Sequence, residues 1–235
     1  AFDEENSRNG FARISAGAAS EPELFLEEKS YTTPVQALNS DAIIYTKGDF
    51  KNPMDLYIND TDWSSERKLT AINPQQADYL WGDVQLVHWN AYDGTPLKGM
   101  LFTPENLDPQ AKYPMVIYFY EKNAETLYSY RAPAPSRSII NIPVFVSQGY
   151  VVFVPDIVYT VGHPGESAYN CICSGAEAMC EQFSFINRDK MGIQGQSWGG
   201  YQTAYLVTRT DMFAAAGAGA PVGNMTSAYG GIRWE

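Results

Sequence analysis

Two uninterrupted apolar runs in the middle of the chain constrain its fold most. Residues 115–120 read Met-Val-Ile-Tyr-Phe-Tyr, and residues 150–154 read Tyr-Val-Val-Phe-Val. A strand with one face in water alternates apolar and polar side chains, whereas a strand of a parallel sheet is buried on both faces and does not alternate. The two runs therefore predict parallel strands and place the chain in the α/β class.

The segments around these runs predict the other parts of an α/β fold. Residues 84–92 alternate in polarity, and residues 97–103 resume after the turn signal Asp93-Gly94, which predicts an antiparallel hairpin. The apolar residues of 166–183 recur at helical spacing. The other expected elements are a short helix at 139–148, a turn at 187–190, a strand at 191–195, a helix at 199–208 and a small-residue strand at 214–220.

The first 80 residues have a different pattern. Residues 41–46 and 55–60 are short β-rich runs separated by turn signals, and they predict an antiparallel sheet. Before residue 40 the chain is acidic and rich in Ala, Ser and Gly, and its pattern assigns no element. We therefore predict two domains, an antiparallel β domain at 1–80 and an α/β domain at 81–235.

The composition excludes several classes of partner. The 235 residues carry 16 Lys and Arg against 27 Asp and Glu, a net charge of −11, so the chain lacks the basic surface that nucleic acid or an anionic membrane requires. No apolar run approaches the roughly 18 residues of a membrane span, so we expect a soluble protein. Cys171, Cys173 and Cys180 lie within one predicted helix with no well-spaced fourth ligand, which predicts apolar packing and no disulfide or metal site. No cofactor site is predicted.

The candidate chemistry is concentrated at one turn. Gly195-Gln196-Ser197-Trp198-Gly199 matches G-x-S-x-G between a predicted strand and a predicted helix, which is the setting that a nucleophile elbow requires. So sharp a turn strains the backbone of the serine, and the two glycines, which have no Cβ, let strand and helix approach. Ser197 is therefore the candidate nucleophile, and the Trp198 N–H at the helix N-terminus is a candidate oxyanion donor.

A serine nucleophile needs a base, and in the fold that carries this motif the acid and the histidine follow the serine. Only Asp211 and Glu235 follow Ser197, and no histidine does. His88 lies in a predicted strand, and His163 lies in a loop after residue 156, where a loop or substrate-contact role is favoured over that of a base. The sequence thus predicts either a chain that stops inside its catalytic domain or a non-catalytic relative.

The residues around the elbow also resemble a known family. Residues 192–201, Gly-Ile-Gln-Gly-Gln-Ser-Trp-Gly-Gly-Tyr, are similar to the nucleophile motif of the prolyl oligopeptidase family of serine peptidases. Further similarity lies at 92–99, at 149–156 and at Ala220-Pro221-Val222. Residues 84–235 thus resemble the first part of that family's α/β-hydrolase catalytic domain, and residues 40–80 resemble the last one or two blades of its N-terminal β-propeller.

The resemblance implies roles for individual residues. Ser197 would be the acylated nucleophile of a peptidase that cleaves oligopeptides, with the Trp198 N–H and the Tyr120 hydroxyl as oxyanion donors. The substrate would be bound by Trp198, Val222, Met225 and Tyr229. The resemblance is greatest to exported bacterial peptidases, which favours a periplasmic or extracellular location over a cytoplasmic one.

Departures from the family pattern leave the substrate preference open. Glu121-Lys122-Asn123 replaces the small residues that usually follow the tyrosine, and Asp156-Ile157-Val158-Tyr159 replaces an Asp-x-Arg-Gly-Ser stretch. Met225 and Ala228 stand where aromatic residues line the pocket of proline-cleaving members. The resemblance therefore implies a peptide substrate without implying a preference for proline.

Three interpretations of the whole chain stay open. The first is a serine peptidase whose Asp and His lie beyond residue 235, so that the chain is truncated at both ends. Such a piece would expose sheet edges, and it would self-associate or pair with missing parts of the same protein. The second is a non-catalytic fragment or pseudo-enzyme that binds peptides or partners. The third is a carboxylesterase on the same fold, against which the propeller-like N-terminus argues.

Overall fold

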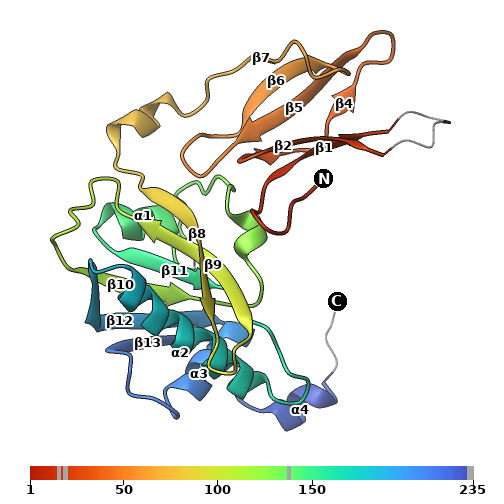
Figure 1. Cartoon of the computed structure of the whole chain (residues 1–235). Coiled ribbons are helices and arrows are strands. Elements are labelled where there is room, and N and C mark those ends of the chain that lie inside the picture. The colour runs from red at the N-terminus through yellow and green to blue at the C-terminus, as the bar shows by residue number, and fades with distance from the viewer. Residues whose placement is uncertain (15–16, 18–20, 137–138, 232–235) are drawn as a thin grey trace.

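The computed structural model describes residues 1–14, 17, 21–136 and 139–231. Figure 1 shows a β-rich N-terminal part, coloured red to orange, above a larger part in which helices flank a central sheet. The central sheet begins at Asp83. The α/β class predicted from the two apolar runs is present.

The N-terminal part contains two antiparallel sheets. Strands β1 (Asn9–Arg13) and β2 (Glu23–Glu27) form a hairpin. The second sheet is built from β3 (Ser30–Tyr31), β4 (Val35–Gln36), β5 (Ala42–Gly48), β6 (Asp55–Asp60) and β7 (Arg67–Lys68). The predicted strands at 41–46 and 55–60 are confirmed as β5 and β6, and the unassigned segment before residue 40 contains β1 to β4.

Aromatic packing joins the β1–β2 hairpin to the second sheet. The ring of Phe11 on β1 stacks on Trp63 with centroids 4.4 Å apart, and it also meets Tyr31 at 5.0 Å and Tyr45 at 5.7 Å. A two-stranded hairpin is marginal by itself in water, so burial of these rings is what holds it in place.

The central sheet has six strands in the order β13-β12-β10-β11-β9-β8. Their bounds are β8 (Asp83–Asn90), β9 (Pro96–Thr103), β10 (Tyr113–Tyr118), β11 (Val151–Pro155), β12 (Ile186–Gln196) and β13 (Ala215–Gly219). The four strands β10 to β13 run parallel, and the β8–β9 hairpin adds antiparallel to β11. The carboxyl ends of the parallel strands therefore meet at one edge, which is where α/β sheets place their sites.

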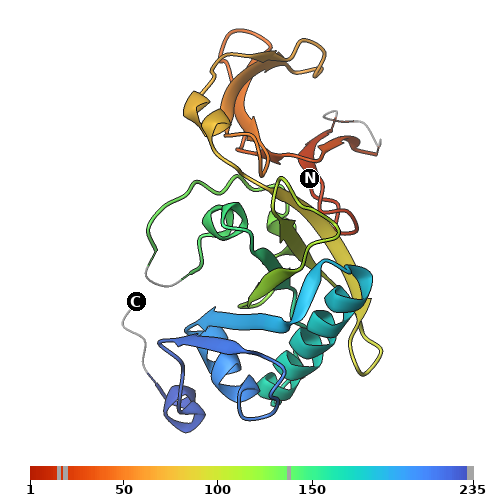
Figure 2. The same cartoon turned by 90° about the vertical axis from the view of Figure 1, so that its left-hand side faces the viewer.

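Helices lie on both faces of this sheet, as Figure 2 shows. Helices α2 (Pro164–Gln182) and α3 (Trp198–Leu206) pack side by side on one face, and the short helix α1 (Ile142–Ser147) packs on the other. The remaining helical turns are η1 (Pro74–Asp78), η2 (Ala124–Thr126) and α4 (Met225–Tyr229). Along β11, Val151 and Phe153 face the α2 side while Val152 and Val154 face the α1 side. This two-sided burial is the reason that the run does not alternate.

The prediction of a turn at 187–190 is wrong. These residues belong to β12, which runs without interruption from Ile186 to Gln196. Their polar side chains are mostly exposed, and the partner strand β10 shifts register between Tyr113 and Met115 opposite them. Residues 187–190 thus form an irregularity between two paired positions, Ile186 opposite Tyr113 and Met191 opposite Met115, and the strand stays extended through them.

The three cysteines pack as predicted. Cys171 and Cys173 are buried on α2 and Cys180 is half-buried, and all three are free thiols. Burial raises the pKa of Cys173 to about 12 and raises the pKa of the other two thiols as well, so they stay protonated and unreactive at neutral pH. No helix among the described residues is long and apolar enough to cross a bilayer.

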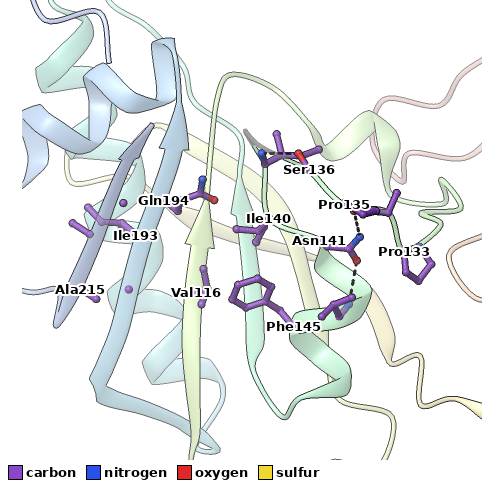
Figure 3. Close-up of a pocket in the computed structure, with 16 residues that line it drawn as sticks. Val116, Pro133, Pro135, Ser136, Ile140, Asn141, Phe145, Ile193, Gln194 and Ala215 are labelled. Atoms are coloured by element: carbon purple, nitrogen blue, oxygen red, sulfur yellow. Dashed lines mark hydrogen bonds between the residues drawn. The ribbon is translucent and has the colours of Figure 1, made fainter. Parts of the chain in front are cut away.

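A groove of about 900 Å³ lies on the face of the sheet that carries α1. Figure 3 shows Val116, Ile193 and Ala215, from three neighbouring strands, along its floor, with Ile140 and Phe145 on the α1 side. We call it the α1 groove. Ser197 does not line it, so the α1 groove and the candidate nucleophile are separate features.

Candidate active site

Ser197 occupies the turn between β12 and α3. Its backbone dihedrals are φ 57° and ψ −108°, a conformation that a residue with a Cβ adopts only under strain. The Ser197 N–H donates to the Gly219 carbonyl of the neighbouring strand at 2.9 Å, and its carbonyl accepts from the Tyr201 N–H at 3.0 Å. These two bonds hold the strained residue in place, so the structure has the geometry that the G-x-S-x-G pattern predicts.

Glycines surround Ser197 because no larger residue fits. A Cβ on Gly195 would lie 2.3 Å from the carbonyl oxygen of Gly199, and a Cβ on Gly199 would lie 2.5 Å from that of Phe119. Gly200 is equally confined, since its Cβ would meet the Gly219 carbonyl oxygen at 2.4 Å. Strand, helix and neighbouring strand thus approach one another at backbone distance.

Trp198 begins helix α3. Its N–H is the first of the helix, so it has no partner within the helix and is available at the positive end of the helix dipole. The indole ring stacks on Tyr201 with centroids 5.0 Å apart, and its Nε1 donates to the Tyr159 hydroxyl at 2.9 Å. The main chain of Trp198 thus stays a candidate oxyanion donor, while its ring is held beside the elbow.

Tyr120 follows the end of β10, beside the same helix. The Phe119 carbonyl and the Tyr120 ring both approach Gly199, where a Cβ would meet Tyr120 Cδ2 at 3.8 Å. The Tyr120 side chain is 39% exposed, so its hydroxyl can reach a ligand. The structure therefore brings together Ser197, Trp198 and Tyr120 from two parallel strands that are neighbours in the sheet.

Three further residues of this site have no assigned role in the sequence. Asp156 and Tyr159 lie in the loop after β11, and Gln202 lies on α3. Asp156 is buried, and its Oδ1 accepts from the N–H groups of Asn123 at 2.6 Å and Ala124 at 2.9 Å. The one signal available in the sequence is the departure of residues 156–159 from the family pattern.

No base is placed at Ser197 by the described residues. Within that part of the chain no imidazole or carboxylate hydrogen-bonds to the Ser197 hydroxyl. His163 Nδ1 instead lies 2.6 Å from Glu166 Oε2, and both side chains are more than half exposed. His88 is exposed on β8. The described residues also contain no group of three or more His, Cys, Asp or Glu that could hold a metal ion.

The remaining residues expected to bind substrate lie beyond β13. Val222 and Met225 are half-buried, whereas Tyr229 at the end of α4 is 98% exposed. Helix α4 is capped by Asn224, whose side chain accepts from the Ser227 N–H at 3.1 Å. The expected role of Tyr229 in binding substrate stays a prediction.

Comparison with known proteins agrees with this geometry. The model of the prolyl oligopeptidase family matches residues 135–234. The matched residues lie within the α/β part, from the segment before α1 to the segment after α4. The resemblance predicted from residues 192–201 is thereby confirmed. Dipeptidyl peptidase 8 of Mus musculus is 31% identical over 153 residues, which is 59% of this chain and 17% of that protein.

Solved structures give the fold of nearly the whole chain. An acylaminoacyl peptidase in complex with a chloromethyl ketone has a TM-score of 0.71 and 19% identity, over 96% of this chain and 39% of its own. The dipeptidyl peptidase 4 of Porphyromonas gingivalis has a TM-score of 0.65 and 19% identity, over 90% of this chain and 31% of its own. The predicted α/β-hydrolase fold is confirmed. The chain spans about a sixth of the curated relatives that it matches and about a third of these solved proteins.

Proposed function

We propose that this chain carries the nucleophile half of a serine peptidase site, with Ser197 as the residue that is acylated. The observation that carries the proposal is the backbone of Ser197, held at φ 57° at the N-terminus of α3 beside the Trp198 N–H. A solvated serine in an ordinary turn needs no such strain, whereas a nucleophile is exposed by it. The relatives are serine peptidases of the prolyl oligopeptidase type, which supports a peptide substrate.

The chemistry would follow the order that an elbow allows. The Ser197 hydroxyl attacks the carbonyl carbon of the scissile bond as its proton passes to a base, and the Trp198 N–H and the Tyr120 hydroxyl donate to the oxygen that becomes negative. The intermediate collapses to an ester on Ser197 as the amine leaves with a proton, and water then releases the acid and restores the hydroxyl. The base is not among the described residues, so we propose that residues outside this chain supply it.

The first test is labelling with a fluorophosphonate, which phosphonylates only an activated serine. We expect the full-length protein encoded with this chain to be labelled and its Ser197→Ala variant not to be. Labelling of the 235-residue chain by itself would mean that it contains a working base, and His163 would then be replaced by glutamine to test it. Labelling that survives Ser197→Ala would overturn the proposal.

A second function is favoured because, in the part of the chain that the structure describes, no imidazole or carboxylate hydrogen-bonds to the Ser197 hydroxyl. The 235-residue chain by itself would then be a peptide-binding piece with no turnover. A panel of oligopeptides and short-acyl esters, given to the full-length protein, separates peptidase from esterase. Hydrolysis of esters without any peptide would replace the peptidase assignment with that of an esterase.

A further inference from the structure

The hydroxyl of Tyr159 lies where three elements of the candidate site meet. Tyr159 belongs to the loop between β11 and α2, and its hydroxyl contacts the Tyr120 carbonyl after β10 and two side chains of α3, Trp198 and Gln202. The ring of Tyr159 is half-buried and lies 6.1 Å from the Trp198 ring between centroids. The hydroxyl of Tyr159 thus touches both candidate oxyanion residues through a single oxygen.

The direction of each hydrogen bond follows from the donors available. The indole Nε1 of Trp198 and the amide Nε2 of Gln202 can only donate, so the Tyr159 oxygen accepts from both. Its own proton then goes to the Tyr120 carbonyl at 3.0 Å. A tyrosine hydroxyl donates once and accepts twice, so every one of its hydrogen-bonding positions is filled.

The Tyr120 carbonyl is held twice. It accepts from the Tyr159 hydroxyl and from Gln202 Nε2 at 3.1 Å, and Gln202 itself is fully buried. Two donors on one carbonyl fix the peptide plane that follows Tyr120, and the direction of the Tyr120 side chain depends on that plane. An oxyanion donor must lie within a few tenths of an ångström of its place, because a misplacement of about 1 Å can cost about a hundredfold in rate.

We propose that Tyr159 is a positioning residue for the oxyanion side of this site, acting through Tyr120. The proposal rests on the proposed function, which gives the Tyr120 hydroxyl its role. Tyr159 touches no reacting atom, and its effect is to hold the Tyr120 phenol where negative charge develops. The interaction grows in the transition state, so its loss is expected in kcat more than in KM.

The test is Tyr159→Phe in the full-length protein, assayed on a peptide substrate. The variant keeps the ring, and the loop keeps its other anchors, Asp156 Oδ1 on two N–H groups and the Ile157 N–H on the Glu121 carbonyl at 3.2 Å, so it is expected to fold. We expect kcat to fall about tenfold with KM changed by less than about twofold. Tyr92→Phe is the matched control, since it also removes one hydroxyl, from a bond to Glu177 at 2.9 Å far from the elbow, and it is expected to change neither.

A double-mutant cycle decides whether Tyr159 acts through Tyr120. If it does, Tyr120→Phe/Tyr159→Phe is no slower than Tyr120→Phe, because the phenol to be positioned is already gone. If the fold-loss of kcat in the double variant equals the product of the losses in the two single variants, Tyr159 acts independently of Tyr120, and the proposal is overturned. An unchanged kcat in Tyr159→Phe would overturn it as well.

A spectroscopic arm keeps this proposal separate from the proposed function. The indole N–H of Trp198, assigned in a ¹⁵N spectrum by its loss in Trp198→Phe, should exchange slowly with solvent in the wild type and in Tyr92→Phe, and rapidly in Tyr159→Phe. If Ser197→Ala retains hydrolysis, the proposed function fails, and the exchange data still report on the Tyr159 contact. An indole that exchanges at the same rate in all the proteins would remove the structural basis of the positioning role.

Discussion

At the scale of single residues, the backbone strain of Ser197 is a structural cost that the proposed role as nucleophile would explain. A non-glycine residue at φ 57° and ψ −108° is strained by about 1 to 3 kcal/mol. Glycine adopts positive φ without that strain, although it loses more backbone entropy on folding. The strain therefore predicts opposite effects of one substitution on stability and on chemistry.

We expect Ser197→Gly to raise the free energy of unfolding by about 1 kcal/mol while abolishing fluorophosphonate labelling. Ser197→Ala keeps the Cβ and the strain, so it should leave the stability close to that of the wild type and also abolish labelling. Urea unfolding of the three proteins measures the difference. A Ser197→Gly protein no more stable than Ser197→Ala would show that the elbow is unstrained.

Ionisation of the Tyr159 hydroxyl should make the free energy of unfolding depend on pH in a way that can be assigned to this one residue. Burial, which outweighs the lowering effect of the Trp198 and Gln202 donors, raises the pKa of Tyr159 to about 12 from the ordinary 10. A group whose pKa is raised by folding contributes stability that is complete below its unfolded pKa and is lost as the pH rises through its folded pKa. We therefore expect the stability difference between wild type and Tyr159→Phe to shrink between pH 10 and about 12. Urea unfolding at neutral pH and across that range checks it, and a difference that stays constant would contradict the burial of the hydroxyl.

At the scale of elements, β12 and α3 can meet only because certain positions lack a Cβ, and β12 offers an internal control. A Cβ on Gly195 would lie 2.3 Å from backbone, whereas a Cβ on Gly192 would meet nothing nearer than 3.5 Å. We expect Gly195→Ala to destabilise the fold by about 3 kcal/mol and Gly192→Ala to change it by less than about 0.5 kcal/mol. Thermal unfolding followed by circular dichroism tests both. Equal effects of the two substitutions would mean that the close approach at the elbow is not required.

At the scale of the whole molecule, the sheet has an open edge next to an open face. Among the residues that the structure describes, strand β13 pairs only with β12. It reads Ala-Ala-Gly-Ala-Gly and is almost entirely exposed, and the α1 groove lies beside it. An uncharged, exposed edge strand is a template for pairing with another chain. We propose that the self-association predicted from the sequence would take place at this edge.

We expect the 235-residue chain to associate as its concentration rises, and Ala216→Lys to suppress this by placing a charge on the β13 edge. Ala228→Lys on the exposed helix α4 is the control and should leave association unchanged. Sedimentation velocity over a series of concentrations distinguishes them. A chain that stays monomeric at every concentration would contradict the self-association. An equal effect of the two lysines would place the association surface elsewhere than at β13.

Local patterns in the sequence determined most of the elements. The unbroken run at 150–154 and the alternation at 84–92 depend only on which faces of a strand are buried, and both became the strands expected. The G-x-S-x-G turn could be predicted equally well, because the need for glycine at 195 and 199 arises within a few residues of Ser197. The lack of apolar periodicity before residue 40 and the polar run at 187–190 misled the same reasoning, since pairing with distant strands outweighed local preference.

Only the tertiary structure decided how the site is held. Tyr159 lies 39 residues from Tyr120 in the chain, and Gln202 lies 82 residues from it, yet both donate to one carbonyl. No spacing rule connects such positions, because their proximity is set by the order of the parallel strands and the packing of α3 on them. The sequence by itself determined the candidate nucleophile and the turn that carries it, since these depend on backbone conformation over five residues. The partners of Tyr120 and Trp198 were decided by the sheet, which brings the ends of separate strands to one edge.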